Sequence, residues 1–204
     1  MFYNDETATT LAKQLLDKAT DDTKIAVVSA PSVFIQLKNL LRSPDYKIRP
    51  EVKLLEFDER FGVFKEWVAY DFAHPTRLHR MVALIKQQNS LTSIKASLRG
   101  QFDRIICDPP FISIDCQTKV AHKAALTVRW LAKFWDPATL RLIICTGERM
   151  ESMMGKLYGK AGVRTTDFEI QHSNGLSNEF RCYANYESNV WQWSAEAEQK
   201  KQGE

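Results

Sequence analysis

This chain of 204 residues lacks several features that would assign it to a class of protein. It has no apolar run near the roughly 20 residues that a membrane-spanning helix needs. Acidic residues occupy the N-terminal stretch, where a secretory signal peptide would carry basic ones. The four cysteines show no CxxC pair or other zinc spacing, and the four histidines show no ligand spacing. We therefore expect no membrane association, no secretion signal and no metal site.

A phosphate-binding glycine loop is also absent. The turn after the first expected strand reads Ser-Ala-Pro-Ser, at residues 29–32, and contains no GxGxxG motif. Such a loop lets the backbone grip a pyrophosphate group, so its absence argues against NAD or ATP held in that way. A nucleoside cofactor without phosphates would not need this grip.

Charge of one sign is not concentrated along the chain. The 28 basic and 25 acidic residues give a net charge of +3 and are spread throughout. Nucleic-acid binding usually shows a basic stripe, so composition neither demands nor excludes such a partner. A hydrophobic content of 44% at this length suits one soluble domain. Cys107 and Cys145 lie in apolar strand-like runs, where buried reduced thiols are common, and this indicates a reducing, cytoplasmic location.

What the sequence does contain is a regular alternation of helix and strand patterns. Helices are expected over residues 5–22, 30–43, 75–88, 120–135 and 148–159. Strands are expected over residues 24–30, 51–58, 63–71, 102–108, 140–147, 166–172 and 179–188. The alternation predicts an α/β fold in which helices cover both faces of a mostly parallel sheet. Two consecutive strands at the end predict a partly antiparallel edge. Residues 1–192 are expected to form one domain and residues 193–204 a solvated tail.

The stretch Ile-Cys-Asp-Pro-Pro-Phe, residues 106–111, ends the fourth expected strand. Prolines have fixed φ angles and no backbone donor, so the strand cannot continue through Pro109 and Pro110. Their carbonyls and the carboxylate of Asp108 are acceptors, and Phe111 places a flat aromatic face beside them. This set suits a nitrogen that has hydrogens to donate. A plain turn after a strand is the structural alternative.

Further acids follow neighbouring strands, Asp58 after the second and Asp71 after the third. Ligands of open α/β sheets bind at the carboxyl ends of the strands, where an acid can accept the hydroxyls of a ribose. As an alternative, either acid could cap a helix or lie in solvent. The coincidence of these acids with the Asp-Pro-Pro-Phe motif at one edge favours a ligand site.

The motif and its neighbouring blocks resemble a known family. An Asn, Asp or Ser followed by two prolines and an aromatic residue is typical of amino-methyltransferases that use S-adenosylmethionine. The blocks that carry the resemblance are YNDETATTLA, VVSAPSVF, LLEFDERF, RIICDPPF, LIICTG and NEFRCYANYES. Over residues 2–188 they resemble the eukaryotic elongation factor 1-alpha lysine methyltransferase family, formerly described as N6-adenine DNA methyltransferases. The resemblance implies a seven-stranded, Rossmann-like class I fold that methylates a lysine of elongation factor 1-alpha with S-adenosylmethionine.

The resemblance also implies roles for the tetrapeptide. Asp108, Pro109, Pro110 and Phe111 match its catalytic positions. Asp108 and the Pro109 carbonyl would accept hydrogen bonds from the target nitrogen and aim its lone pair at the cofactor methyl. Phe111 would stack on a base, or contact a lysine ammonium or the sulfonium. The motif offers no strong base, so the acceptor of the lysine proton stays open.

Cofactor residues follow from the same resemblance. Asp58 matches the acid that binds ribose, and Asp71 matches the acid near the adenine amino group. Residues 29–32 stand where most methyltransferases carry a GxGxG loop, so the contacts there are expected to differ. The residues implied for cofactor binding are Phe2, Tyr3, Thr7, Ser29, Ala30, Pro31, Ser32, Asp58 and Asp71.

Other functions stay open beside lysine methylation. N6-adenine methylation of nucleic acid could use the same tetrapeptide, but the small size and the missing basic stripe argue against it. A binding module that kept the fold and lost turnover is the second alternative. For a protein substrate, Asn178, Glu179 and Arg181 would lie beside the site and read the partner, or form a weak surface ion pair. We expect a monomer whose partner is elongation factor 1-alpha rather than nucleic acid.

Overall fold

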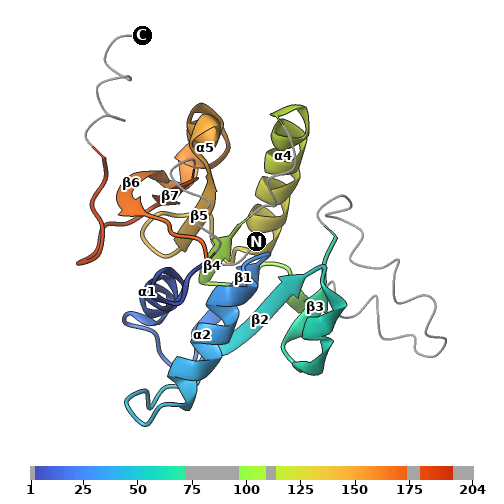
Figure 1. The fold of residues 1–204 in the computed structure, drawn as a ribbon, viewed down its shortest axis with the longest axis vertical. Coiled ribbons are helices and arrows are strands. Elements are labelled where there is room, and N and C mark those ends of the chain that lie inside the picture. Colours follow the sequence, from blue (N-terminus) through green and yellow to red (C-terminus); the bar gives the residue numbers. More distant parts are fainter. Residues whose placement is uncertain (1–2, 72–96, 109–113, 174–179, 195–204) are drawn as a thin grey trace, which may run out of the picture.

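The computed structural model describes residues 3–71, 97–108, 114–173 and 180–194 of the chain (Figure 1). Its strands form one seven-stranded sheet in the order β3-β2-β1-β4-β5-β7-β6. They are β1 (Lys24–Val28), β2 (Glu51–Glu56), β3 (Trp67–Ala69), β4 (Arg104–Cys107), β5 (Arg141–Gly147), β6 (Arg164–Glu169) and β7 (Phe180–Ala184). Neighbouring strands are parallel except at β7, which is antiparallel to both β5 and β6. The predicted α/β sheet with an antiparallel addition is confirmed.

Helices cover both faces of the sheet (Figure 1). One face is covered by α1 (Asp5–Leu16) and α2 (Pro31–Arg42), and the other by α4 (Ile114–Leu131) and α5 (Glu151–Tyr158). The connections contain the short 3-10 helices η1 (Glu59–Val63), η3 (Glu148–Met150) and η4 (Gly159–Ala161). The predicted helix over residues 75–88 lies outside the described residues.

Alternate residues of the central strands pack into two separate hydrophobic cores, one on each face of the sheet. In β1, Ile25 and Val27 belong to the core under α1 and α2, whereas Ala26 and Val28 belong to the core under α4 and α5. All of them are at most 1% exposed. Because successive side chains of a strand point to opposite faces, a strand that is apolar throughout must be covered on both sides. This is why a continuous apolar run, rather than an alternating one, marks the middle of the sheet.

The structure differs from the prediction between β2 and β3. Residues 59–63 form the 3-10 helix η1, so the strand predicted from residue 63 does not begin until Trp67. Val63 is 83% exposed. Phe64 instead packs edge-on against Phe34 of α2, with ring centroids 5.2 Å apart. Aromatic contact with a neighbouring helix, rather than strand pairing, decides this conformation, and the predicted start of the third strand was wrong.

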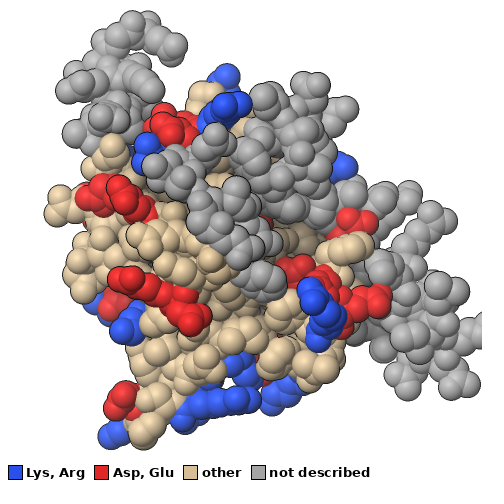
Figure 2. Space-filling view, viewed as in Figure 1, with Lys and Arg blue, Asp and Glu red and all other residues tan. Residues whose placement is uncertain are grey.

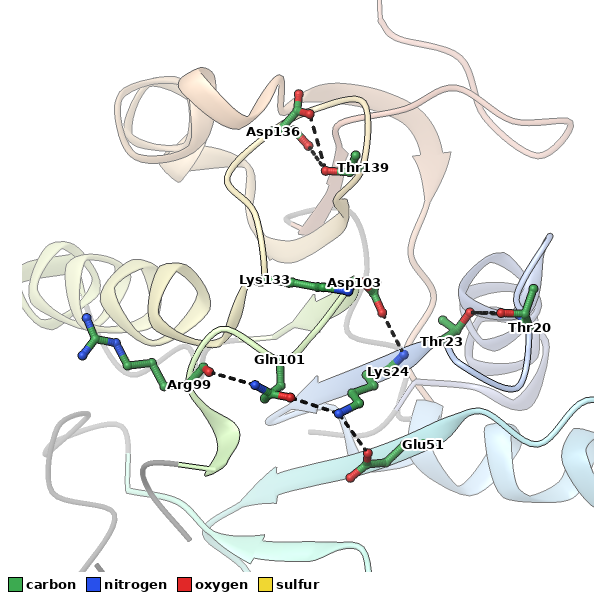
Figure 3. Close-up of polar contacts among 10 residues, drawn as sticks. All are labelled: Thr20, Thr23, Lys24, Glu51, Arg99, Gln101, Asp103, Lys133, Asp136 and Thr139. Atoms are coloured by element: carbon green, nitrogen blue, oxygen red, sulfur yellow. Dashed lines mark hydrogen bonds and ion pairs between the residues drawn. The ribbon is translucent and has the colours of Figure 1, made fainter. Parts of the chain in front are cut away.

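Polar side chains join the amino ends of the central strands (Figure 3). The carboxylate of Asp103 accepts from the backbone N–H of Lys24 at 3.1 Å. The Nζ of Lys24 donates to Gln101 at 3.0 Å and lies 3.6 Å from a carboxylate oxygen of Glu51. These partly exposed contacts connect β1, β2 and the start of β4, and each adds little free energy of folding. They occupy the edge of the sheet opposite to the carboxyl ends of the strands.

The N-terminal segment is attached to the chain just beyond β6. Tyr3 forms an isolated antiparallel bridge with His172. The backbone N–H of Asn4 donates to the carbonyl of Gln171 at 3.0 Å, and the N–H of Gln171 donates to the hydroxyl of Thr7 at 3.2 Å. Asn4 also caps α1 by accepting from the N–H of Thr7 at 2.8 Å. The start of the chain is thereby held over the carboxyl ends of the strands.

Three cysteines, Cys107, Cys145 and Cys182, are buried free thiols. Burial of Cys107 and Cys145 confirms the prediction for these two. Within the described ranges, no helix is both long enough and apolar enough to cross a membrane. The chain remains in contact with β6 as far as Ser194, whose N–H donates to the carbonyl of Thr165 at 2.9 Å, so this contact reaches into the segment expected to be a tail.

Candidate active site

The centre of the sheet contains a topological switch point. β1 and β4 are parallel neighbours with Val28 opposite Cys107. The helix after β1, α2, lies on one face of the sheet, and α4, the first described helix after β4, lies on the other. Carboxyl ends arranged in this way frame the crevice in which open α/β sheets bind their ligands. Ser29 and Asp108 are the first residues beyond the two strands.

The turn after β1 has an uncommon backbone conformation. The φ angle of Ser29 is 54°, in the left-handed region that residues with a side chain rarely adopt. Its N–H donates to the carbonyl of Leu55 at 2.9 Å. Helix α2 then begins at Pro31 without a side-chain cap, so the positive end of its dipole lies at the crevice. Backbone strain of this kind concentrates at functional sites.

Asp108 is the buried acid of the crevice and is 7% exposed. Its backbone N–H continues the pairing of the strands by donating to the carbonyl of Val28 at 3.0 Å. Burial raises the pKa of the Asp108 carboxyl to about 7, and the negative charge of Glu56 acts in the same direction, while the hydroxyl of Tyr3 lowers it. Near neutral pH this carboxyl is therefore divided between its ionised and its protonated form.

Tyr3 reaches the same place from the N-terminal segment. It is 4% exposed, and its ring lies 5.4 Å from the imidazole of His172. Its hydroxyl lies beside the carboxyl of Asp108 and the thiol of Cys145, although no group in the described part of the chain meets the standard geometry of a hydrogen bond to it. Burial and the carboxylate raise the pKa of Tyr3 well above its ordinary value, so the phenol keeps a proton that it can donate.

Glu56 is a site residue that the sequence analysis missed. It is the last residue of β2, and its charge acts on Asp108. Its carboxylate accepts from the backbone N–H groups of Phe57, at 2.9 Å, and Asp58, at 3.1 Å. The signal was available, because an acid that ends the second strand is the expected ribose ligand. It was missed because the strand was predicted to run on to residue 58.

Asp58 lies two residues further on, where it caps η1. Its carboxylate accepts from the backbone N–H of Arg60 at 2.9 Å and binds the guanidinium of the same residue. These hydrogen bonds from Arg60 hold the pKa of Asp58 below its ordinary value. Capping was the alternative left open for this residue, and the structure places it in that role.

The remaining residues implied for cofactor binding surround the crevice. The hydroxyl of Ser32 accepts from the N–H of Tyr3 at 3.4 Å, and Ala30 is 1% exposed in the turn before α2. Thr7 uses its hydroxyl to hold Gln171, as described above. Asp71 follows Tyr70, whose hydroxyl forms a 2.9 Å hydrogen bond with Thr127 of α4. The structure thus places Tyr3, Ser29, Ala30, Ser32 and Asp108 at the carboxyl ends of β1 and β4, while the individual ligand contacts of all these residues stay predictions.

Arg181 is the described member of the residues expected to read a substrate. Arg181 lies near the start of β7, and its guanidinium lies 3.3 Å from the carboxylate of Glu148. Both side chains are substantially exposed, at 40% and 54%, so this ion pair contributes little to stability. The other predicted site residues that lie outside the described ranges are Phe2, Pro109, Pro110, Phe111, Asn178 and Glu179.

Charge is unevenly distributed over the face seen in Figure 2. Acidic side chains lie over α1, acidic and basic side chains lie together beside η1 and around β6 and α5, and a row of basic side chains lies around the far end of α2. Near the carboxyl ends of the strands the described acids include Asp5, Glu6, Asp58, Glu59, Glu148 and Glu151, and the described basic residues there include Arg60, Arg149 and Arg181. Among the described residues, no three His, Cys, Asp or Glu side chains are placed to share a metal ion.

The strand order and the position of the site define the class of protein. A parallel sheet ordered 3-2-1-4-5, extended by an antiparallel seventh strand inserted before the sixth, is the fold of class I methyltransferases. The crevice between β1 and β4 is where this class binds its ligands.

This chain belongs to the family described as "Probable N6-adenine methyltransferase", whose model matches residues 1–188. This confirms the resemblance read from the sequence blocks.

Curated relatives of the chain are named as enzymes that methylate protein. The chain is 36% identical over 205 residues to the protein-lysine N-methyltransferase EFM5 of Saccharomyces cerevisiae, covering 95% of this chain and 73% of that protein. It is 37% identical over 192 residues to the EEF1A lysine methyltransferase 1 of Danio rerio, covering 93% and 96%. The human protein of the same name is 31% identical over 190 residues, covering 93% and 73%.

Among solved structures, the chain is similar to TrmN from Thermus thermophilus, with a TM-score of 0.46 and 13% identity. The match covers 94% of this chain and 52% of that one. The order of the strands in the sheet, and not this likeness, identifies the fold.

Proposed function

We propose that this chain is an S-adenosylmethionine-dependent protein-lysine N-methyltransferase that methylates elongation factor 1-alpha. The observation that carries the proposal is the buried acceptor Asp108 at the switch point of a chain whose relatives are named protein-lysine methyltransferases. A carboxylate in this position can accept a hydrogen bond from an amine nitrogen and fix its direction. The shared part of the relatives spans nearly the whole chain, the site included.

S-adenosylmethionine fits the residues around the crevice. The uncapped start of α2 offers backbone N–H groups to a carboxylate, and the acids at the end of β2 and just beyond it offer acceptors to ribose hydroxyls. The Ser29 turn suits a cofactor that has no phosphates to grip. When bound, this cofactor supplies a methyl group on a positive sulfonium, which a neutral amine can attack.

Glu56 is the acid we propose for the ribose, with Asp58 as its neighbour. The carboxylate of Glu56 contacts backbone N–H groups next to it in sequence, whereas that of Asp58 is held by the guanidinium of Arg60. A carboxylate that is already paired with arginine is less available to a ligand. The resemblance favours Asp58, so the two acids are compared by substitution below.

The tetrapeptide has the central role in the reaction we propose. Asp108 and the Pro109 carbonyl accept from the lysine nitrogen, Pro110 fixes the turn, and Phe111 stacks against the substrate. The lysine must arrive neutral, and a buried, poorly hydrated site lowers its pKa. The further residues we propose are Phe2, Tyr3, Thr7, Ser29, Ala30, Pro31, Ser32 and Asp71 for the cofactor and Asn178, Glu179 and Arg181 for the substrate protein.

Methylation of adenine in nucleic acid is the second candidate, because the family description names that reaction. Nucleic-acid binding relies on basic side chains that neutralise phosphates. The described residues near the carboxyl ends of the strands are mainly acidic, as noted above, which supports a protein substrate. We also propose a cytoplasmic location, since the buried cysteines of the sheet are reduced.

Methyl transfer from radiolabelled S-adenosylmethionine tests the proposal directly. Elongation factor 1-alpha and adenine-containing DNA are offered in parallel reactions. We expect label on the protein, at lysine, and its loss with Asp108→Ala. Label on the DNA would replace the proposed substrate, and label on neither, with cofactor still bound, would favour a non-catalytic binding module.

A further inference from the structure

Three buried tyrosine hydroxyls, those of Tyr3, Tyr183 and Tyr186, have no hydrogen-bond partner of standard geometry in the described ranges. A buried hydroxyl without a partner costs free energy, so each one needs an explanation. Tyr3 differs from the other two because its hydroxyl lies beside Asp108, the buried acid of the crevice.

The position of Tyr3 is set by the fold. Its backbone is bridged to His172 beyond β6, and its N–H donates to the hydroxyl of Ser32 in α2 at 3.4 Å. Its ring is held against the imidazole of His172, which in turn packs edge-on against Phe180 at 4.6 Å. Contacts with several distant parts of the chain therefore direct the hydroxyl towards the crevice.

Among the described residues, the other titratable groups that face Asp108 offer it no comparable donor. Glu56 at the end of β2 is an acid and repels a second negative charge. Cys107 of β4 and Cys145 of β5 have their pKa values raised, Cys107 by burial and Cys145 mainly by its contact with the Cys182 thiol, so they stay neutral. A thiol is a weak donor. The phenol of Tyr3 is thus the strongest donor that the described residues bring to this carboxyl.

We propose that Tyr3 is a positioning residue for Asp108: its hydroxyl donates a hydrogen bond to one carboxylate oxygen and leaves the other facing the nitrogen to be methylated. That a nitrogen is methylated beside Asp108 rests on the proposed function, whereas the pairing of Tyr3 with Asp108 does not. Without this donor the carboxyl would hold a proton at neutral pH and could no longer accept from the substrate through the same oxygen.

The first test compares Tyr3→Phe with Tyr186→Phe, which removes another buried hydroxyl that has no standard partner. For Tyr3→Phe we expect turnover at pH 7 to fall about fivefold, because losing a hydrogen bond to a charged group raises the midpoint by about one pH unit and lowers the ionised fraction of Asp108 from about a half to about a tenth. At pH 9 most of the turnover returns, since the acid limb of the profile has moved up by about one pH unit. Tyr186→Phe keeps the wild-type midpoint.

The second test needs no substrate and separates this inference from the proposed function. The free energy of unfolding is measured by urea titration across the pH range for wild type, Tyr3→Phe and Tyr186→Phe. The decline of wild-type stability with pH ends near the pKa of Asp108, about 7. In Tyr3→Phe it ends about one unit higher. In the Asp108→Asn background, Tyr3→Phe no longer changes the profile.

A merely structural tyrosine would give a different pattern. Tyr3→Phe would then lower turnover by the same factor, and the free energy of unfolding by the same amount, at every pH. If the midpoints of both pH profiles stay at their wild-type values in this way, the inference is overturned. If Tyr3→Phe does not fold, the Cζ carbon of Tyr3 is followed by NMR in the wild-type protein. A resonance that shifts with a midpoint near the Asp108 pKa supports the pairing, and a resonance that ignores this titration rejects it. A shifted unfolding profile in a protein that methylates nothing would retain the pairing and reject the proposed function.

Discussion

A carboxyl group withdrawn from water loses part of its charge at neutral pH, and Asp108 is such a group. Its burial favours the protonated form, yet the chemistry proposed for it needs an acceptor. A neutral carboxyl still accepts through its carbonyl oxygen, and a carboxamide has the same oxygen without the titration. The substitution of Asp108 can therefore separate acceptor geometry from charge.

We expect Asp108→Ala to reduce methyl transfer by about a hundredfold or more, because the acceptor that orients the nitrogen is lost. Asp108→Asn should retain part of the activity and lose the pH dependence of the acid group. Cofactor affinity, measured by calorimetry, is expected to persist in both. Asp103→Asn, which weakens the polar network at the opposite edge (Figure 3), is the control and should keep full turnover. Wild-type turnover in Asp108→Ala would remove this residue from the mechanism.

The two acids at the end of β2 and just beyond it, Glu56 and Asp58, can be ranked by their effect on cofactor binding. Glu56→Gln is expected to raise the dissociation constant of S-adenosylmethionine about tenfold or more, as for a lost hydrogen bond to a charged group. Asp58→Asn is expected to have a smaller effect, because Arg60 already binds this carboxylate. Calorimetry measures both. The reverse ranking would restore the role that the resemblance assigns to Asp58.

The left-handed turn at Ser29 gives a stability prediction with a control in the same chain. Lys18 has almost the same φ angle, 55° against 54°, but follows the far end of α1. A side chain in this region costs about 1–2 kcal/mol, part of which glycine loses again through entropy. Ser29→Gly and Lys18→Gly should each raise the free energy of unfolding by up to about 1 kcal/mol. A large decrease in the free energy of unfolding for Ser29→Gly, but not for Lys18→Gly, would mean that the fold needs the Ser29 side chain and not only the turn.

At the scale of secondary-structure elements, the site depends on how the N-terminal segment is attached. Asn4 begins α1 and also donates to Gln171 through its side-chain amide at 2.9 Å. The segment therefore joins the cap of one helix to the chain beyond β6. Tyr3 lies on this segment, so loosening it moves a side chain of the crevice without touching any strand.

Asn4→Ala tests this attachment. Loss of an N-cap costs about 0.5–2 kcal/mol, and we expect turnover to fall further than the lost stability explains. Faster hydrogen exchange at the amides of Asn4 and Gln171 would locate the change. The control is Asp136→Ala, which removes a side-chain bond to the N–H of Ala138 in a turn before β5. If both variants lose stability and keep turnover alike, attachment of the segment does not control the site.

Elements with strong periodicity could be predicted from the sequence, and those decided by tertiary contact could not. The buried strands around Ile25 and Ile106 follow from apolar runs between turn residues, because only a covered sheet accommodates them. The third strand was predicted to begin at residue 63 instead of Trp67, since an aromatic residue such as Phe64 fits a strand or a loop, and its contact with Phe34 of α2 is visible only in the fold. For the same reason Asp108 could be found from its motif, whereas its neighbours Glu56 and Tyr3 came together only through the fold.

For the whole molecule, burial of Asp108 makes stability depend on pH. The native pKa of about 7 lies above the ordinary value of 3.8, so the native state binds the proton more tightly and stability falls as pH rises through this interval. Relative to Asp108→Asn, the wild-type protein is expected to lose about 2–3 kcal/mol between pH 5 and pH 8. Urea titrations at both pH values measure this difference. Parallel profiles for the two proteins would mean that Asp108 is ionised in the folded state as it is in water.

The place of β7 has a consequence for how the protein is made. This strand comes last among the described strands of the chain, yet it lies inside the sheet, between β5 and β6. During synthesis from the N-terminus, β5 therefore exposes an unpaired edge until residues 180–184 have emerged. Contacts between segments so far apart in sequence also form slowly. A nascent chain that lacks this strand cannot complete the sheet, and it depends on protection from aggregation until translation reaches its final part.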